Sequence, residues 1–331
     1  MSTPPAVPHD SAQALRALLA AGRFQEALEL HRGLADRPDA GREDVQLLAA
    51  TAATRLGELD LGTSLADRAL QKYRRRGDRD GRMRSLNLLG AIHFERGNMR
   101  DAEQRFAEAL RLGRQLGDSL MLARACNNLA SVALLQGRSD EAAELYREAL
   151  LAYQRLGDRR GMAETYHNLG IVYRWAGNRR GAEDAANDAV RHATVVGEGS
   201  LLALVLTGRA ELSVERDNPA LALRELERAA RLAREASDVI GAAEVVRVEA
   251  LAALRQANWQ GALAHAEAAR AVALTHQSVQ LAAECAGIAA RALRELGRVE
   301  EANERRSEAE EGFRELGATF LLQRLQQEWK S

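Results

Sequence analysis

The sequence predicts an all-α solenoid, a stack of helix-turn-helix units that forms one domain. Aromatic residues make up only 4% of the 331 residues and the chain holds five prolines, which is typical of long helices rather than of sheets. A fixed spacing of small and large apolar residues also recurs along the chain. Such self-similarity indicates a solenoid, because each unit buries its apolar face only by stacking on its neighbours.

A short loop inside each unit sets the register of the repeat. Equivalent loop positions lie 35 residues apart at the first interval and 40 residues apart at every later one. Five residues after each loop position stands a small residue, as close crossing of two helices requires. The loop positions are Gly22, Gly57, Gly97, Gly137, Gly177, Asp217, Ala257 and Gly297. The small residues are Ala27, Gly62, Ala102, Ala142, Ala182, Ala222, Ala262 and Ala302.

Polar residues predict where the helices begin. An asparagine follows the loop position in four units and can cap the second helix of its unit. These asparagines are Asn98, Asn178, Asn218 and Asn258. Between units, Gly117-Asp118 and Gly157-Asp158 offer a glycine that ends one helix and an aspartate that caps the next. Each unit is expected to hold two helices of roughly 14 and 18 residues.

The repeat resembles the tetratricopeptide repeat in a longer, 40-residue form, over roughly residues 11–320. The copies at 85–110 and 165–190 match best, because they carry the Leu-Gly pair, the small alanines and the loop glycine of that family. The resemblance implies a right-handed superhelix of helix pairs whose concave surface binds a protein or a peptide.

The expected organisation has three parts. Residues 1–10 form a flexible tail, residues 11–320 form the superhelix, and residues 321–331 belong to an amphipathic helix that caps the last unit. The superhelix is expected to contain about eight repeats. Their boundaries fall at about 11–42, 43–82, 83–122, 123–162, 163–202, 203–242, 243–282 and 283–320.

Charge, hydropathy and cysteine content narrow the class of protein. A formal net charge of -1 provides no overall field that attracts nucleic acid or an anionic membrane. No apolar run is long enough to insert into a membrane, and MSTPPAVPHD lacks the parts of a signal peptide. Cys126 and Cys285 cannot form the disulfide framework of a secreted protein. We therefore expect a cytoplasmic protein, and its Arg-rich and Ala-rich composition suggests a bacterial source.

Residues with catalytic or metal-binding potential are scattered. There is no Gly-rich phosphate loop, and no Cys or His pair has zinc spacing. Glu164 and His167 form a single Glu-x-x-His, which di-metal carboxylate bundles use in pairs, so a solvated groove histidine is the simpler interpretation. His93 and Cys126 align with packing positions of other units. We expect no enzyme activity, no metal site and no cofactor.

A basic run marks the junction of the second and third units. It begins at Lys72 and continues to Arg84, with Asp78 and Asp80 as its only acidic residues. One interpretation is a contact for an acidic partner or for phosphates. The simpler interpretation is a solvated junction.

The candidate binding site lies on the second face of the first helices in the central units. Asparagine recurs there in three adjacent units, and its amide both donates and accepts, so a ladder of amides can hold an extended peptide by its backbone. Trp175 and Leu135 could add apolar pockets at the rim. The predicted peptide-binding or partner-binding residues are Arg84, Asn87, Arg124, Asn127, Asn128, Ser131, Glu164, His167, Asn168, Ile171 and Trp175. In the other interpretation, the asparagines satisfy neighbouring helices or face water.

Charged residues continue this face toward the C-terminus and suit a partner that carries both signs of charge. They are Glu211, Glu215, Glu244, Arg247, Arg255, Arg291 and Arg294. Where the chaperone-tail receptors of the family present two basic groups, this chain has Glu164 and Asn168, so recognition of chaperone tails is not expected.

Two classes of function follow from these observations. The first is a non-catalytic scaffold or adaptor whose groove holds a peptide, a disordered segment or a helix of a partner protein. The alternative is a peptide-responsive regulatory sensor that acts through a separate output protein, because 40-residue repeats are similar to those of bacterial peptide-responsive regulators. Nucleic acid is not an expected partner. The divergent terminal units leave room for self-association.

Overall fold

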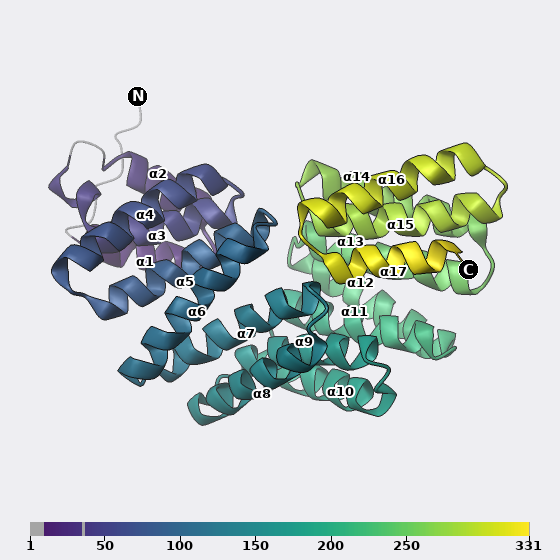
Figure 1. The fold of residues 1–331 in the computed structure, drawn as a ribbon, viewed down its shortest axis with the longest axis horizontal. Coiled ribbons are helices and arrows are strands. Elements are labelled where there is room, and N and C mark those ends of the chain that lie inside the picture. Colours follow the sequence, from purple (N-terminus) through teal and green to yellow (C-terminus); the bar gives the residue numbers. More distant parts are fainter. Residues whose placement is uncertain (1–9, 35–36, 331) are drawn as a thin grey trace. The chain divides into compact units, whose positions relative to one another are not determined.

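The computed structural model describes residues 10–34 and 37–330, and these residues form α-helices joined by short loops, with one 3-10 helix and no strand (Figure 1). The prediction of an all-α protein is confirmed. The helices are α1 Ser11–Ala20, α2 Phe24–Arg32, α3 Glu43–Arg55, α4 Leu59–Arg76, α5 Arg79–Glu95, α6 Met99–Leu116, α7 Ser119–Leu135, α8 Ser139–Leu156, α9 Arg159–Trp175, α10 Arg179–Val196, α11 Gly199–Glu215, α12 Pro219–Glu235, α13 Val239–Arg255, α14 Trp259–Thr275, α15 Val279–Glu295, α16 Val299–Glu315 and α17 Thr319–Lys330, with η1 at Pro38–Gly41.

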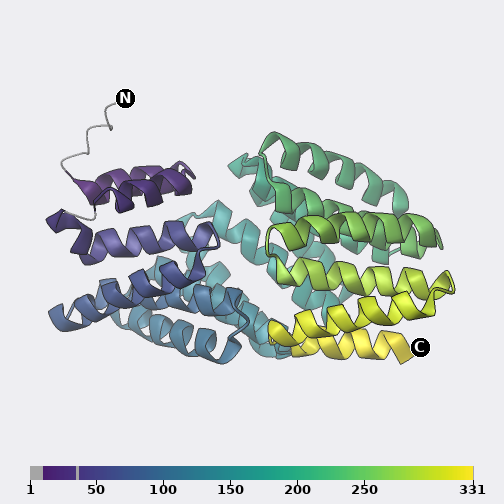
Figure 2. The ribbon, with the colours of Figure 1, turned by 90° about the horizontal axis from the view of Figure 1, so that it is seen from above.

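The chain divides into two compact units. The N-terminal unit comprises residues 1–125 and the C-terminal unit residues 126–331, so the boundary falls inside α7. Within each unit the helices pair in sequence order, for example α5 with α6, α9 with α10 and α11 with α12. Figure 2 shows the last helices of the C-terminal unit layered one after another. Each unit is therefore a stack of helix pairs, which is the arrangement of a solenoid.

The predicted loop positions carry the backbone conformation that ends a helix. All eight have a positive φ, from 56° at Ala257 to 79° at Gly137. At Gly57 the amide donates to the Thr54 carbonyl at 3.1 Å, and the Glu58 amide donates to the Ala53 carbonyl at 2.9 Å. This pair of bonds satisfies carbonyls that the helix end leaves free. The loop register predicted from the sequence is confirmed at all eight repeats.

Ala257 occupies a left-handed position without being glycine, so its replacement by glycine should stabilise the protein. The side chain of an L-residue crowds the backbone at φ 56°, which costs about 1 kcal/mol. We expect Ala257→Gly to raise the free energy of unfolding by about that amount in urea titrations followed by tryptophan fluorescence. The control Ala271→Gly, at an exposed position inside α14, should lower it by about 1 kcal/mol. A loss of stability in both variants would contradict the prediction.

The column of small residues lies in the core of the stack. Ala27, Ala102, Ala142, Ala262 and Ala302 have no solvent-exposed area, Ala182 and Ala222 are exposed by 1% and 2%, and Gly62 is buried. The prediction that these positions pack between helices is confirmed. Close packing at these sites holds each second helix against its neighbours.

Helix starts follow the capping prediction at three of the four asparagines. Asn178 and Asn258 each accept the amide of the third helical residue at 3.0 Å, and Asn218 does so at 3.3 Å. The prediction for Asn98 is wrong, because its side chain forms no such bond. Helix α6 instead carries Asp101 in its first turn, where a negative charge stabilises the positive end of the helix dipole, and the three capped helices have no acidic residue there.

The first helices are longer than the roughly 14 residues expected. From α5 onward each has 17 residues. They begin directly after a boundary residue, and Asp78, Asp158 and Asp238 accept an amide of the first turn at 2.8–2.9 Å. The helices therefore begin at boundary aspartates, as predicted for Asp158, and the expected length is about three residues too short.

The two ends of the chain are described in part. Asp10 accepts the amide of Ala12 at 3.0 Å and so caps α1, whereas the rest of the predicted tail, residues 1–9, lies outside the described residues. At the other end α17 packs on α16, with Leu321 and Leu325 buried. Within residues 10–34 and 37–330, no helix combines the length and the apolar character that crossing a membrane requires.

Candidate functional site

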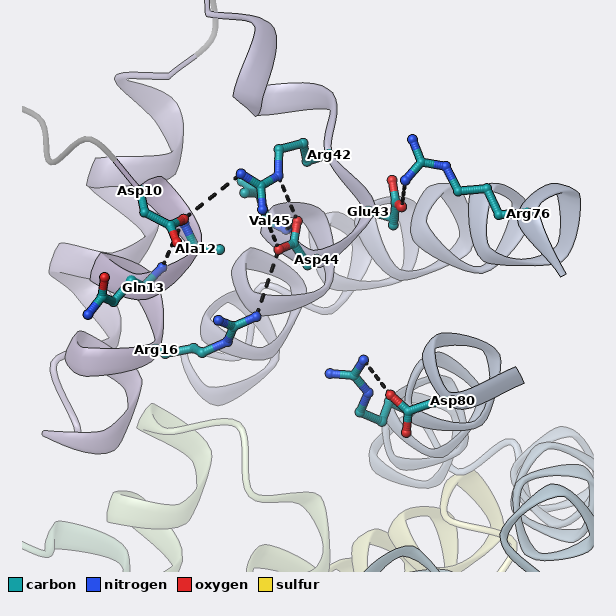
Figure 3. A network of polar contacts seen from close by, with 11 residues as sticks. Asp10, Ala12, Gln13, Arg16, Arg42, Glu43, Asp44, Val45, Arg76 and Asp80 are labelled. Atoms are coloured by element: carbon teal, nitrogen blue, oxygen red, sulfur yellow. Dashed lines mark hydrogen bonds and ion pairs between the residues drawn. The ribbon is translucent and has the colours of Figure 1, made fainter. Parts of the chain in front are cut away.

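The predicted site residues fall in both units. Arg84, Asn87 and Arg124 belong to the N-terminal unit, and the other eight belong to the C-terminal unit. Arg84 pairs with Asp80, one helical turn earlier, at 2.7 Å, and Asp80 is labelled in Figure 3. Asn87 is half-buried and Arg124 is exposed.

Two of the predicted residues on α7 contact neighbouring helices. The Thr165 hydroxyl of α9 donates to Oδ1 of Asn127 at 3.1 Å. The Ser131 hydroxyl lies 2.9 Å from that of Tyr146, which is buried in α8, and Asn128 next to Asn127 is half-buried. The side chains of Asn127 and Ser131 therefore join helices, as the alternative interpretation of the sequence proposed.

Glu164 and His167 on α9 lie in different environments. Glu164 pairs with Arg160 at 3.0 Å, and burial raises the pKa of its carboxyl. The ring of His167 lies so close to Gly208 of α11 that a Cβ atom there would be 2.5 Å from it. Burial, reinforced by the charge of Arg174, lowers the pKa of His167 to about 4. His167 is therefore a neutral packing residue at pH 7, and over the described ranges no three His, Cys, Asp or Glu side chains come together as metal ligands would.

Asn168 keeps an unpaired side-chain amide, and Ile171 lies near it on the same helix. Both are half-buried. The side-chain amide of Asn168 has no hydrogen-bond partner among the described residues. Ile171 follows Asn168 by three positions and lies on the same side of α9. A peptide backbone could therefore bond to Asn168 without breaking a contact inside the protein.

Trp175 is covered by the chain itself. Its ring stacks on Phe320 of α17, with centroids 4.7 Å apart and an angle of 24° between the planes. Phe320 also lies against Gly137, where a Cβ atom would be 3.5 Å away. The indole nitrogen of Trp175 is buried and has no partner in the described part of the chain. A partner can therefore reach the ring face that Phe320 covers only where Phe320 moves aside.

A network of buried charges crosses four first helices of the C-terminal unit, and we call it the ion ladder. Arg174 of α9 contacts Glu211 of α11 at 2.6 Å, and Arg247 of α13 contacts the same carboxylate at 3.0 Å. The side chains of these three residues are only 11–13% exposed. The members of the ion ladder are Arg174, Glu211, Glu215, Glu244, Arg247 and Glu284.

The ion ladder contains more carboxylates than guanidinium groups. Burial opposes ionisation of Glu211, but Arg174 and Arg247 hold the pKa of its carboxyl well below the usual range. Glu284 lies 3.3 Å from Arg247, yet burial raises the pKa of its carboxyl and the nearby Glu244 adds to the effect. The two arginines therefore neutralise the centre of the ladder more completely than its end on α15.

Two of the other charged residues expected on this face contact the last helix. Arg291 of α15 pairs with Glu328 of α17 at 3.3 Å. Arg294 donates to the Trp329 carbonyl at 3.1 Å and lies over the Trp329 ring at 5.0 Å. Arg255 is exposed. Helix α17 thus occupies the part of the face that α15 would otherwise offer to a partner.

Arg174 and Glu284 were not among the candidate residues, although the sequence holds a signal for them. Three of the four ion-ladder pairs on successive first helices are 36 or 37 residues apart, as in the pair of Glu211 and Arg247, whereas Arg174 and Glu215 are 41 apart. The shorter separation is the 40-residue repeat less about one helical turn. A search for opposite charges 36 or 37 residues apart would find these pairs, whereas aligning the repeats at 40 residues does not bring the two partners together.

The fold and this face define the protein as an α-solenoid of helix pairs with a polar surface built from its first helices. The family model described as tetratricopeptide repeat matches residues 42–115 and 121–194. These two stretches are tetratricopeptide repeats, as the resemblance in the sequence implied. No curated protein is similar enough in sequence to match it.

Solved structures share the fold at low sequence identity. A Rap protein complexed with competence and sporulation factor has a TM-score of 0.79 at 12% identity, covering 93% of this chain and 86% of that one. The Rap conjugation gene regulator of plasmid pLS20, in complex with a Phr peptide, gives 0.66 at 15%, covering 86% and 74%. Aspartyl phosphate phosphatase F from Bacillus subtilis gives 0.68 at 12%, covering 92% and 84%. At these identities the likeness concerns the fold alone.

Proposed function

We propose that the protein is a non-catalytic adaptor that binds a peptide or an extended segment of a partner on the first-helix face of its C-terminal unit. This face is defined by Asn168 and Ile171 of α9 together with the ion ladder. The observation that carries the proposal is the unpartnered side-chain amide of Asn168 on α9, the helix that also supplies Arg174 to the ion ladder, since polar groups fix the register of a bound chain and apolar ones provide contact area.

The similar structures support a ligand of this class. One of them was solved with the Phr* peptide bound and another with competence and sporulation factor bound, as their names state. A third is named as a phosphatase, so hydrolysis of an aspartyl phosphate belongs among the assays. The absence of catalysis is part of the proposal, because the histidine of this face, His167, is half-buried, packs against Gly208 and is neutral at pH 7.

A second candidate function is a peptide-responsive sensor, and the stack of Phe320 on Trp175 favours it. A ligand that stacks on the ring face of Trp175 now covered by Phe320 has to displace Phe320. The displacement would release the start of α17 from its contact with α9. Ligand binding would then change the surface that the C-terminal unit presents to an output protein. Peptide-induced changes in tryptophan fluorescence, compared between wild type and Phe320→Ala, test this candidate. An identical response in both proteins would rule it out.

The adaptor proposal is tested by changing the shape of the face without changing the fold. Ile171→Arg places a long charged side chain among the ligand contacts, so capture of partners from native lysate by the immobilised protein should fall at least tenfold. The control Val195→Arg makes the same substitution on α10 at a position that is 60% exposed, and it should leave capture unchanged. Equal capture by wild type and a folded Ile171→Arg protein would refute the proposed site.

A further inference from the structure

An open hollow lies in the N-terminal unit, far from the residues of the proposed peptide site in sequence. The segment before α3, the first residue of α3 and the last turns of α4 enclose about 390 Å³. Small-molecule sites have volumes of about 300–1,000 Å³, so this space can hold a compact ligand. It is lined by Pro38, Gly41, Arg42, Glu43, Lys72, Arg75 and Arg76.

Positive charge exceeds negative charge around the hollow. Among its lining residues are four cations and one carboxylate. Figure 3 shows that Arg76 reaches Glu43 and that Arg42 lies against Asp44, which it contacts at 2.8 Å. These pairs neutralise two of the four cations.

The other two cations have no carboxylate partner among the described residues. The Lys72 ammonium donates to the Gly41 carbonyl, which is neutral. Arg75 is exposed and forms no ion pair within the described ranges. An ammonium has three N–H donors and a guanidinium has five, so both groups keep donors for a ligand. The hollow therefore offers two positive charges with free hydrogen-bond donors.

The start of α3 adds little to this potential. Its first turn holds Glu43 and Asp44, and the Asp44 carboxylate accepts the Val45 amide at 2.9 Å. These carboxylates offset the partial positive charge that a helix N-terminus carries. The attraction for an anion therefore comes from Lys72 and Arg75, which line the same space.

We propose that this hollow binds the phosphate group of a small phosphorylated ligand. A phosphate monoester carries a charge of about -1.5 to -2 at pH 7 and several acceptor oxygens, which matches the two unneutralised cations. A guanidinium binds such a group through two parallel bonds, and a lysine binds it as a point charge. The hollow belongs to the N-terminal unit and the peptide face to the C-terminal unit, and the phosphate site does not depend on the adaptor proposal.

The test measures binding of inorganic phosphate and of phosphoserine to the full chain by titration calorimetry, at constant ionic strength adjusted with chloride. Both probes are expected to bind saturably, and phosphoserine more tightly, because the hollow is larger than a phosphate ion. Arg75→Gln should weaken both by roughly tenfold, since it removes charge-assisted hydrogen bonds. Arg75 forms no ion pair or side-chain hydrogen bond within the described ranges, so this variant should keep the wild-type circular dichroism spectrum and melting temperature.

Arg180→Gln is the matched control, because it removes the same charge from α10 at a side chain that is 94% exposed. It should bind both probes as wild type does. Lys72→Gln provides a second variant and should also weaken binding roughly tenfold. The proposal is overturned if wild type shows no saturable binding of either probe, or if Arg180→Gln weakens binding as much as Arg75→Gln.

Discussion

Arg247→Met is expected to lower the free energy of unfolding of the C-terminal unit by about 3–5 kcal/mol. The Arg247 guanidinium, 11% exposed, contacts the carboxylates of Glu211, Glu244 and Glu284. Methionine keeps the apolar stem but removes the charge, so three partly buried carboxylates lose their common partner. Urea denaturation followed by tryptophan fluorescence measures the loss, because Trp175, Trp259 and Trp329 are the only tryptophans and all belong to this unit.

Arg255→Met is the matched control for this prediction. Arg255 ends the same helix, is exposed, and forms no ion pair within residues 10–34 and 37–330. Its replacement should change the stability by no more than about 0.5 kcal/mol. A comparable loss in both variants would mean that the destabilisation comes from the altered net charge rather than from the ion ladder.

The repeat register could be predicted from the sequence because it depends on backbone geometry and on residue size. A left-handed position after a helix favours glycine, and a close crossing of helices requires a small side chain. These constraints act on single positions, so they recur in the sequence at the period of the structure. Even Asp217 and Ala257, which break the glycine pattern, keep the left-handed conformation, because the 40-residue period places a loop there.

The candidate site could be predicted only in part, because it depends on contacts between units. The sequence indicates that Asn127 carries an amide, but only the structure shows that this amide meets Thr165 instead of a ligand. The stack of Trp175 on Phe320 joins residues 145 positions apart in the sequence. Such a contact depends on the small rotation from each helix pair to the next, summed over several pairs, and no local pattern encodes it.

Acidification from pH 6.5 to pH 4 is expected to lower the stability of the C-terminal unit by about 1–3 kcal/mol through His167. The pKa of this histidine is about 4 in the folded protein and near 6.5 when the chain is unfolded. The unfolded chain therefore binds more protons in this window, so stability is fully present above pH 6.5 and falls as the pH drops toward 4. Partial exposure of the ring explains the lower end of the range.

The variant His167→Gln isolates this contribution, because glutamine stays neutral throughout the window. Other buried groups also respond to acid. Glu164 and Glu284, whose pKa values are raised by burial, favour the folded state as the pH falls, and Glu211, whose pKa is lowered by Arg174 and Arg247, favours unfolding below about pH 4.5. These contributions are shared by wild type and variant, so they cancel in the difference between the two. The difference in unfolding free energy should change by about 1–3 kcal/mol between pH 6.5 and 4, and a constant difference would show that His167 is protonated equally in the folded and unfolded chain.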